Sequence, residues 1–248
     1  MSRMVLIFAI AHLIVPAHAD HYIQSGPTFK DCEACPEMVV IPKGGYSYTN
    51  PWSERSHFRE KLTPRDVNVN SFALAKTEIT QRQWLAIINF MPKQPHQCDD
   101  CPVVNISWDD AKYYVYKLSK ATGKKYRLPT DIEWEYACRA GRHKSHCGSD
   151  VNSVAWHAGN SDGRAHEVAQ KLPNHFGLYD MSGNVREWLN DCLQEKTNGT
   201  WQCSEVKGLR NGSWRYSSDN VSIGEKNFLP GHFHRDDLGI RPAMDVIK

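Results

Sequence analysis

The sequence predicts an α+β fold with few helices, small antiparallel sheets and long structured loops. Two runs rich in β-branched residues, at 37–49 and 67–76, predict strands early in the chain. Three amphipathic segments follow between 80 and 141, and each is preceded by a Ser or Thr that can cap a helix. From 142 onward the chain is rich in Gly, Asn and Asp, so only short strands are expected there, around 208–214 and 238–246.

Each expected helix has a visible start and end. Thr80 begins a capping box that ends at Gln83, and the later helices begin after Ser107 and Thr130. The second helix should stop at Gly123, and the third near residue 141. The apolar and aromatic residues along the three helices are Trp84, Ile87, Ile88, Tyr113, Val115, Tyr116, Leu118, Trp134, Tyr136 and Ala137.

The strand predictions rest on local pattern. In EMVVIPKGGYSYT, Gly44 and Gly45 interrupt a β-branched run, which indicates a strand, a turn and a second strand. The stretch 67–76 begins with apolar and polar residues in alternation and predicts a further strand. The polar, irregular stretch 50–66 predicts a surface loop.

The composition is that of an ordinary globular protein. The chain has 248 residues, 40% of them hydrophobic, and a formal net charge of +2. Lys and Arg are scattered, so nucleic acid is not an expected partner. With no internal repeat or linker, we expect one domain over residues 20–248, with its core at about 35–245.

The first 19 residues predict a secretory signal peptide. A positively charged start is followed by an apolar run too short to span a bilayer comfortably, and Ala17-His18-Ala19 then fits a cleavage site before Asp20. The alternative is an uncleaved anchor. No later stretch is apolar enough to cross a membrane. We therefore expect a periplasmic or secreted protein that is not transmembrane after cleavage.

Eight cysteines fall into four local pairs, which suits an exported protein. One alternative makes the two Cys-x-x-Cys pairs a single zinc site, although their separation exceeds that of a compact zinc module. A redox Cys-x-x-Cys is disfavoured because no βαβ pattern surrounds either pair. The expected disulfides are Cys32–Cys35, Cys98–Cys101, Cys138–Cys147 and Cys192–Cys203.

A series of blocks resembles a known family. In order, the blocks are CPEMVVIPKGGY (35–46), E-I-T-x-x-Q-W (78–84), PVVNISWDDAKYYVYKLS (102–119), YRLPTDIEWEYACRAG (126–141), NHFGLYDMSGNVREWLND (174–191), LRNGSWR (209–215) and LGIR (238–241). Together they resemble the formylglycine-generating enzyme (sulfatase-modifying factor) family over nearly the whole mature chain. The resemblance implies a modified C-type-lectin-like fold.

The resemblance also implies a structural calcium ion in GLYDMSGNVREW, 177–188. Carried over by position, its ligands are the side chains of Asp180 and Glu187 and the carbonyl oxygens of Gly183 and Val185. Such oxygen donors on a bent loop suit calcium. The alternative is an Asx-turn with Glu187 solvated. The family's second calcium site is not expected, because the loop 155–171 is short and Asn160 and Asp162 are its only remnants.

One part of the family pattern is missing. The enzyme that names the family converts a substrate cysteine to formylglycine, using two cysteines that bind copper(I), a soft metal that thiolates suit. Their positions fall at Tyr216 and Val221 here, and Arg186 replaces a tryptophan of the calcium loop. We therefore expect neither copper nor formylglycine chemistry.

What remains of the family cleft has two interpretations. In one, Arg186 and Arg241 donate hydrogen bonds to an anionic or peptidic ligand. In the other, Arg241 pairs with an internal carboxylate and Ser213 caps a turn. The candidate cleft residues are Arg186, Ser213, Trp214, Tyr216, Asp237 and Arg241.

A separate pattern could hold a metal. His232, His234 and Asp236 alternate and would share one face of an extended segment, which is the ligand set of a non-haem iron triad. The alternative is a solvated histidine-rich loop.

These observations predict an exported binding or accessory protein of the cell envelope. It would be stabilised by calcium and would bind a peptide or a protein partner. The alternative is an oxidoreductase of different chemistry on the same scaffold, because a fold does not fix a function.

Overall fold

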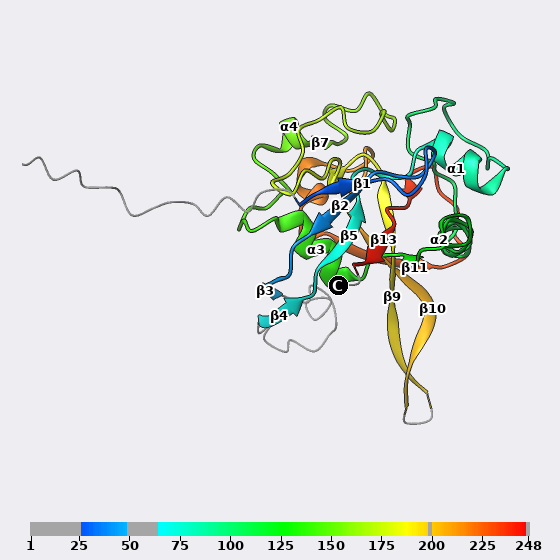
Figure 1. The fold of residues 1–248 in the computed structure, drawn as a ribbon. Coiled ribbons are helices and arrows are strands. Elements are labelled where there is room, and N and C mark those ends of the chain that lie inside the picture. The colour runs from blue at the N-terminus through cyan, green and yellow to red at the C-terminus, as the bar shows by residue number, and fades with distance from the viewer. Residues whose placement is uncertain (1–25, 49–63, 198–199, 247–248) are drawn as a thin grey trace, which may run out of the picture.

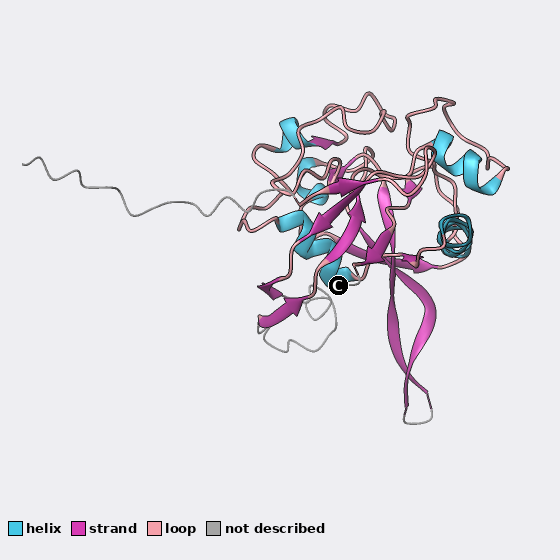
Figure 2. Cartoon of the chain, viewed as in Figure 1, coloured by secondary structure: helices cyan, strands magenta, loops and turns pink. Residues whose placement is uncertain are grey.

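The computed structural model describes residues 26–48, 64–197 and 200–246, and it has the predicted α+β architecture, as Figure 1 and Figure 2 show. The predicted signal peptide and most of the predicted loop 50–66 lie outside these residues. In the described part, no helix is long and apolar enough to cross a membrane.

The helices are Gln81–Ile88 (α1), Trp108–Thr122 (α2), Asp131–Arg139 (α3) and Val151–Val154 (α4), and a 3₁₀ turn covers Ser218–Val221. The strands before α4 are Thr28–Phe29 (β1), Met38–Ile41 (β2), Gly44–Tyr48 (β3), Arg65–Val69 (β4), Phe72–Ala75 (β5) and Tyr126–Arg127 (β6). The later strands are Ala155–Trp156 (β7), Ser182–Gly183 (β8), Arg186–Thr197 (β9), Thr200–Arg210 (β10), Lys226–Pro230 (β11), Leu238–Gly239 (β12) and Ala243–Asp245 (β13).

The three longer helices begin at the predicted caps. Thr80, Ser107 and Thr130 each accept a hydrogen bond from the amide of the third helical residue, whose side chain returns a bond to the cap amide. At its C-terminal end α2 is capped by Gly123 in the left-handed conformation, with a φ of 71°. Tyr113 is exposed, as is Tyr116, because the buried stripe of α2 consists of Ala111, Tyr114, Val115 and Leu118.

A five-stranded sheet, in the order β1-β2-β5-β13-β6, forms the centre of the fold. Alternate residues of its antiparallel strands enter two different hydrophobic clusters. Met38 and Ala73 belong to the cluster that includes residues of α1 and α2, whereas Val39 and Leu74 belong to the cluster that includes residues of α3. The sheet is therefore buried on both faces.

A long antiparallel ribbon made by β9 and β10 projects from the body of the molecule (Figure 1). The expectation of only short strands after residue 142 was wrong here. The outer half of the ribbon is exposed on both faces, so it has no apolar alternation by which a strand is recognised. Backbone pairing and the Cys192–Cys203 disulfide hold its two strands together instead.

The four predicted disulfides are all present, and none of the eight cysteines is free. This arrangement leaves no thiolate for a zinc ion shared by the two Cys-x-x-Cys pairs. Cys138 and Cys147 lie in the second hydrophobic cluster, where their disulfide ties α3 to the loop that follows it.

A buried ionic cluster joins α3 to β10. The guanidinium of Arg210, which has no solvent exposure, pairs with Asp131 and, at 2.6 Å, with Glu135. Lys226 donates to Asp131 at 2.7 Å. Burial alone would raise the pKa of Asp131, but the charges of Arg210 and Lys226 outweigh it and lower that pKa to about 2.

Candidate functional site

The loop 177–188 gathers several carbonyl oxygens around one spot, and that spot holds the side-chain amide of Asn211. The Nδ2 atom of Asn211 lies 2.9 Å from the carbonyl oxygen of Asp180, 2.7 Å from that of Gly183 and 3.1 Å from that of Val185. Its Oδ1 atom accepts the amide of Gly183. Asn211 therefore satisfies the backbone groups that the family resemblance assigns to an ion.

Left-handed backbone conformations produce the bend. Asp180, Gly183 and Asn184 have φ values of 55°, 78° and 55°. A Cβ atom at Gly183 would lie 2.1 Å from the carbonyl oxygen of Trp156, so only glycine fits this position. The bend brings three oxygens together that an extended segment would keep apart.

The two carboxylates predicted as ligands also have protein partners. Glu187 is fully buried; its Oε1 atom lies 2.9 Å from Arg241, and its Oε2 atom accepts the indole Nε1–H of Trp134 at 2.6 Å. Asp180 accepts the amide of Ala169 through Oδ2 at 2.7 Å. Its other oxygen, Oδ1, is buried and has no hydrogen-bond partner among the described residues.

A third buried carboxylate, Glu78, was not predicted from the sequence. Its Oε2 atom accepts the side-chain amide of Asn184 at 2.8 Å, and its Oε1 atom accepts the backbone amide of Val185 at 3.1 Å. Burial, together with repulsion from Asp180 and Glu187, raises the pKa of Glu78 well above its ordinary value. The only available signal was its place in the E-I-T block, two residues before the cap of α1.

Burial also raises the pKa of Asp180, to about 6, against the opposing effects of the Ala169 amide and Arg241. Three carboxylates thus share one guanidinium, and raised pKa values favour protonation of Glu78 and Asp180.

These residues do not fit a calcium ion in the observed arrangement. Calcium takes six to eight oxygen ligands. The carbonyl oxygens of Gly183 and Val185 are engaged by Asn211, and both oxygens of Glu187 are engaged by Arg241 and Trp134. Among the predicted ligand atoms, only Oδ1 of Asp180 has no hydrogen-bond partner in the described residues.

The two positions that would carry the copper thiolates hold groups of a different kind. The guanidinium of Arg186 lies 4.2 Å from the ring centre of Tyr216, and the Tyr216 hydroxyl accepts Arg235 Nη2–H at 3.1 Å. Val221 is 1% exposed and packs with Val154 and Ala155. A phenol in a cation–π contact and a buried isopropyl group do not fit copper(I).

Arg241 is not the ligand-facing donor suggested by the first interpretation of the cleft. Arg241 is fully buried; it pairs with Glu187 and donates to the carbonyl oxygens of Ala75 and Tyr179. The internal pairing considered as the alternative is therefore right. Arg186 is 5% exposed, and in the described part of the chain its side chain has no ion pair.

Ser213 and Asp237 belong to a buried polar chain. Ser213 Oγ donates to Asp237 Oδ2 at 2.9 Å and accepts the amide of Arg215 at 3.4 Å. Arg235 Nε lies 3.0 Å from the other oxygen of Asp237, an ion-pair distance without the alignment of a hydrogen bond. These contacts fix the segment that precedes Trp214.

Trp214 borders a cavity of about 310 Å³, which we call the Trp214 groove. Its residues come from α1 and the loop between α1 and α2, from the segment 163–165 and from the segments that follow β10 and β11, so distant parts of the chain meet there. Pro95, Pro102, Val104 and Trp214 supply apolar surface, and Arg164 and Asp236 supply opposite charges. Of these, only Trp214 had been predicted as a cleft residue.

The alternating set His232, His234 and Asp236 does not converge on a metal. The imidazole of His234 lies 3.1 Å from Asp110, and Asp236 pairs with Arg215. His232 stacks on the ring of Phe233 at 5.1 Å. With separate partners, the three side chains offer no shared ligand geometry.

Comparisons with known proteins agree with this fold. Residues 24–246 match the family model of the sulfatase-modifying factor enzyme 1-like domain. The chaperone protein LppX of Paenibacillus barcinonensis is 26% identical over 268 residues, which is 86% of this chain and 89% of LppX. The formylglycine-generating enzyme of Thermomonospora curvata is 35% identical over 125 residues, which is 44% of this chain and only 38% of that enzyme.

Solved structures of other proteins have a similar fold. PvdO from Pseudomonas aeruginosa superimposes with a TM-score of 0.74 at 28% identity, covering 90% of this chain and 99% of PvdO. Treponema denticola variable protein 1, at 23% identity and a TM-score of 0.73, shares the fold. Because the family model matches nearly all of the described residues, the chain belongs to the sulfatase-modifying factor (formylglycine-generating enzyme) family.

Proposed function

We propose that this chain is an accessory member of its family that binds polypeptide segments and does not form formylglycine. The observation that carries the proposal is the replacement of both copper thiolates, by Tyr216 beneath Arg186 and by the buried Val221. All eight cysteines are in disulfides, so no other thiol of the chain is available to supply the missing donors.

The Trp214 groove supports a binding role. Its volume of about 310 Å³ is in the range of small ligand pockets, and its lining combines apolar rings with one pair of opposite charges. Tryptophan and proline surfaces suit an extended peptide, because they add contact area at little cost in side-chain entropy. A full-length relative, LppX, is named a chaperone, which agrees with an accessory role.

Export is part of the same proposal. Four disulfides suit an oxidising compartment, and residues 1–19 have the composition of a secretory signal. We place the protein in the cell envelope or outside the cell.

Two assays test the function. The purified protein is incubated with copper(I), oxygen and a sulfatase-type cysteine peptide, beside the Thermomonospora curvata enzyme as a positive control, and mass spectrometry measures the aldehyde. We expect no aldehyde from this chain. Its formation would contradict the proposal.

The second assay measures binding of fluorescein-labelled, carboxymethylated lactalbumin, which is permanently unfolded. Trp214→Ala should weaken the affinity by about tenfold or more, because buried aromatic anchors dominate such interfaces. Trp201→Ala is the matched control, since Trp201 is exposed on the ribbon. Absence of binding, or equal binding by the two variants, would remove the groove from the proposal.

A further inference from the structure

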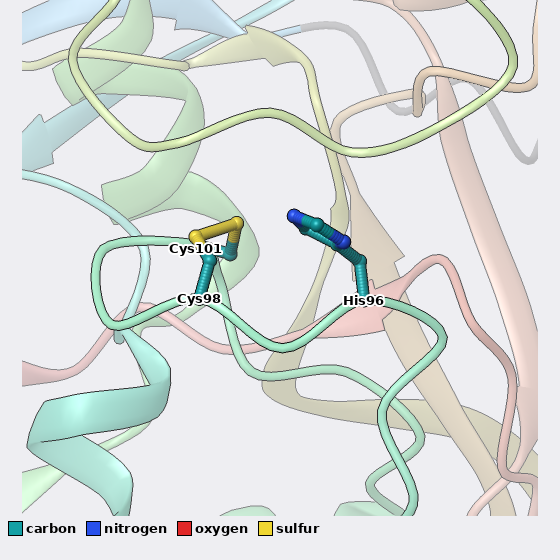
Figure 3. Close-up of side chains that lie close together, drawn as sticks. All are labelled: His96, Cys98 and Cys101. Carbon is teal, nitrogen blue, oxygen red and sulfur yellow. A yellow bond between two sulfur atoms is a disulfide. The ribbon is translucent and has the colours of Figure 1, made fainter.

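A histidine lies beside a short disulfide at the edge of the Trp214 groove. The two sulfur atoms of Cys98 and Cys101 and a ring nitrogen of His96 lie within 4.8 Å of one another. In Figure 3 the imidazole and the disulfide rise from the same loop and face each other across a gap. His96 is exposed, Cys98 is half-buried and Cys101 is buried.

Gln81, the first residue of α1, holds all three members in place. Its Nε2–H group donates to the carbonyl oxygen of His96 at 2.9 Å, and its Oε1 atom accepts the amide of Cys98 at 3.2 Å. Its own backbone amide donates to the carbonyl oxygen of Cys101 at 2.9 Å. One buried residue thus sets the backbone position of His96 relative to Cys98 and Cys101.

The same contacts place the turn 98–101 at the N-terminal end of α1. Besides Gln81, Arg82 donates its backbone amide into the turn, to the carbonyl oxygen of Asp99 at 3.1 Å. The positive end of a helix dipole favours a thiolate over a thiol. The turn that carries the disulfide therefore lies at the positive end of this dipole.

The disulfide can be approached from two sides. Cys101 and His96 border the Trp214 groove, and Cys98 borders a second cavity of about 330 Å³ beside α1. The disulfide between Cys138 and Cys147, by contrast, is enclosed in the hydrophobic core. Access to a sulfur is a requirement for thiol–disulfide exchange.

We infer that Cys98–Cys101 is an exchangeable disulfide that oxidises the thiols of a polypeptide that is bound in the Trp214 groove and extends into the second cavity, where its thiol reaches Cys98. The polypeptide nature of this substrate rests on the proposed binding function. The two sulfurs have different roles. Cys98 is the more exposed, and the carboxylate of Glu167, 4.0 Å from its sulfur, disfavours a thiolate there. Cys101 is therefore the better leaving group.

The exchange balances in two steps. A substrate thiolate attacks Sγ of Cys98, the Cys98–Cys101 bond breaks, and its electron pair leaves on Cys101, which takes a proton from the His96 imidazolium. A second thiolate of the substrate then attacks the substrate sulfur of the mixed disulfide and releases Cys98 as a thiolate that becomes protonated. Two substrate thiols lose two electrons, and the disulfide gains them, so each protein molecule completes one round unless another oxidant restores it.

The chain contains a matched control. Cys32–Cys35 has the same spacing and likewise has one buried sulfur residue. In the described residues, no His, Asp or Glu completes a cluster with that pair, and neither cysteine borders the Trp214 groove. The two disulfides therefore differ in surroundings rather than in ring size.

The experiment uses the oxidised full chain and reduced glutathione. Samples are quenched with iodoacetamide at intervals, and mass spectrometry of non-reduced digests locates the labelled cysteines. Cys98–Cys101 should open faster than Cys32–Cys35 by on the order of tenfold. With oxidised glutathione, Cys101→Ser should retain an adduct on Cys98. His96→Gln should slow the opening of Cys98–Cys101 and flatten its pH profile, with Cys32–Cys35 unchanged.

Equal opening rates for the two pairs would overturn the exchange itself, and an unchanged pH profile in His96→Gln would overturn the role of His96 as the proton donor. Reduced, unmodified lactalbumin tests the substrate: it should open Cys98–Cys101 faster than glutathione does, and Trp214→Ala should remove only that advantage. If carboxymethylated lactalbumin binds but exchange fails, the inference falls and the proposed function stands. If glutathione exchanges but no unfolded polypeptide binds, the proposed function and the polypeptide substrate fall together.

Discussion

The amide nitrogen of Asn211 lies 2.7 Å from the carbonyl oxygen of Gly183, in the middle of the loop that the family resemblance assigns to calcium. A neutral donor built into the chain thus satisfies the carbonyl groups that the family resemblance assigns to a cation. The loop keeps the bend of an ion-binding segment while its oxygens bind a side chain.

Replacing Asn211 with glycine tests whether the Asn211 side chain takes the place of a cation in this loop. Asn211 has a φ of 66°, so glycine keeps the backbone conformation while the amide is lost. We expect a loss of about 1–3 kcal/mol in unfolding free energy in the presence of EDTA, because three carbonyl groups lose their donor. Thermal melts should show that calcium restores stability to Asn211→Gly and leaves the wild type unchanged.

Asn105→Gly is the control, since Asn105 is also left-handed, with a φ of 57°, but donates to a single carbonyl. A wild-type melting temperature that rises with calcium and falls with EDTA would instead restore the calcium prediction.

The two buried arginines of the β9–β10 ribbon should respond differently to methionine. Arg210→Met leaves Asp131 and Glu135 without their shared guanidinium, so we expect a loss of about 3–5 kcal/mol. Arg186→Met removes the cation–π contact with Tyr216, for which we expect a loss of about 1–2 kcal/mol. Urea unfolding of the two variants gives the comparison, and equal losses would show that the carboxylate pairs are not what stabilises Arg210.

Acid should destabilise the fold through Asp131. Its pKa is lowered to about 2 in the folded state. At pH values between this pKa and the higher pKa of Asp131 in the unfolded chain, the unfolded chain binds more protons than the folded protein does. The stabilisation is complete above the unfolded pKa and is lost as the pH falls towards 2; we expect the contribution to be roughly 2 kcal/mol. The free energy of unfolding, measured across this pH range, should decrease as the pH falls, and Asp131→Asn should make this decrease smaller. If Asp131→Asn leaves the pH dependence of the unfolding free energy unchanged, titration of other groups must cause it.

Gly212 should tolerate no side chain. A Cβ atom there would lie 2.1 Å from the carbonyl oxygen of Asn220, next to the segment that carries Val221. We expect Gly212→Ala to cost about 1–3 kcal/mol, because backbone atoms must move apart. Gly224→Ala is the control, since its added Cβ would meet no atom within 4 Å. Similar melting temperatures for the two variants would contradict the close approach.

The helices were predictable because their signals are local. The caps at Thr80, Ser107 and Thr130 are each read from four consecutive residues, and the structure shows all three capping boxes. The disulfides were predictable for the same reason, since every pair closes a short loop.

The candidate site was less predictable because its contacts are distant in sequence. Glu78 meets Val185 across 107 positions, and Arg241 meets Glu187 across 54. Nothing in the residues near Asn211 indicates that its side chain enters the loop at 180–185. The ribbon was missed for a different reason: a strand that packs against nothing has no hydrophobic period.

The ribbon also has a mechanical consequence. β9 begins in the interior, where Glu187 pairs with Arg241, and β10 ends there, where Arg210 pairs with Asp131, so each strand has a buried ion pair at its inner end. Tension or torque applied to the tip by a bound partner would be transmitted along two covalent chains to these paired charges. A force on the projecting ribbon would therefore act on the two buried ion pairs at its base.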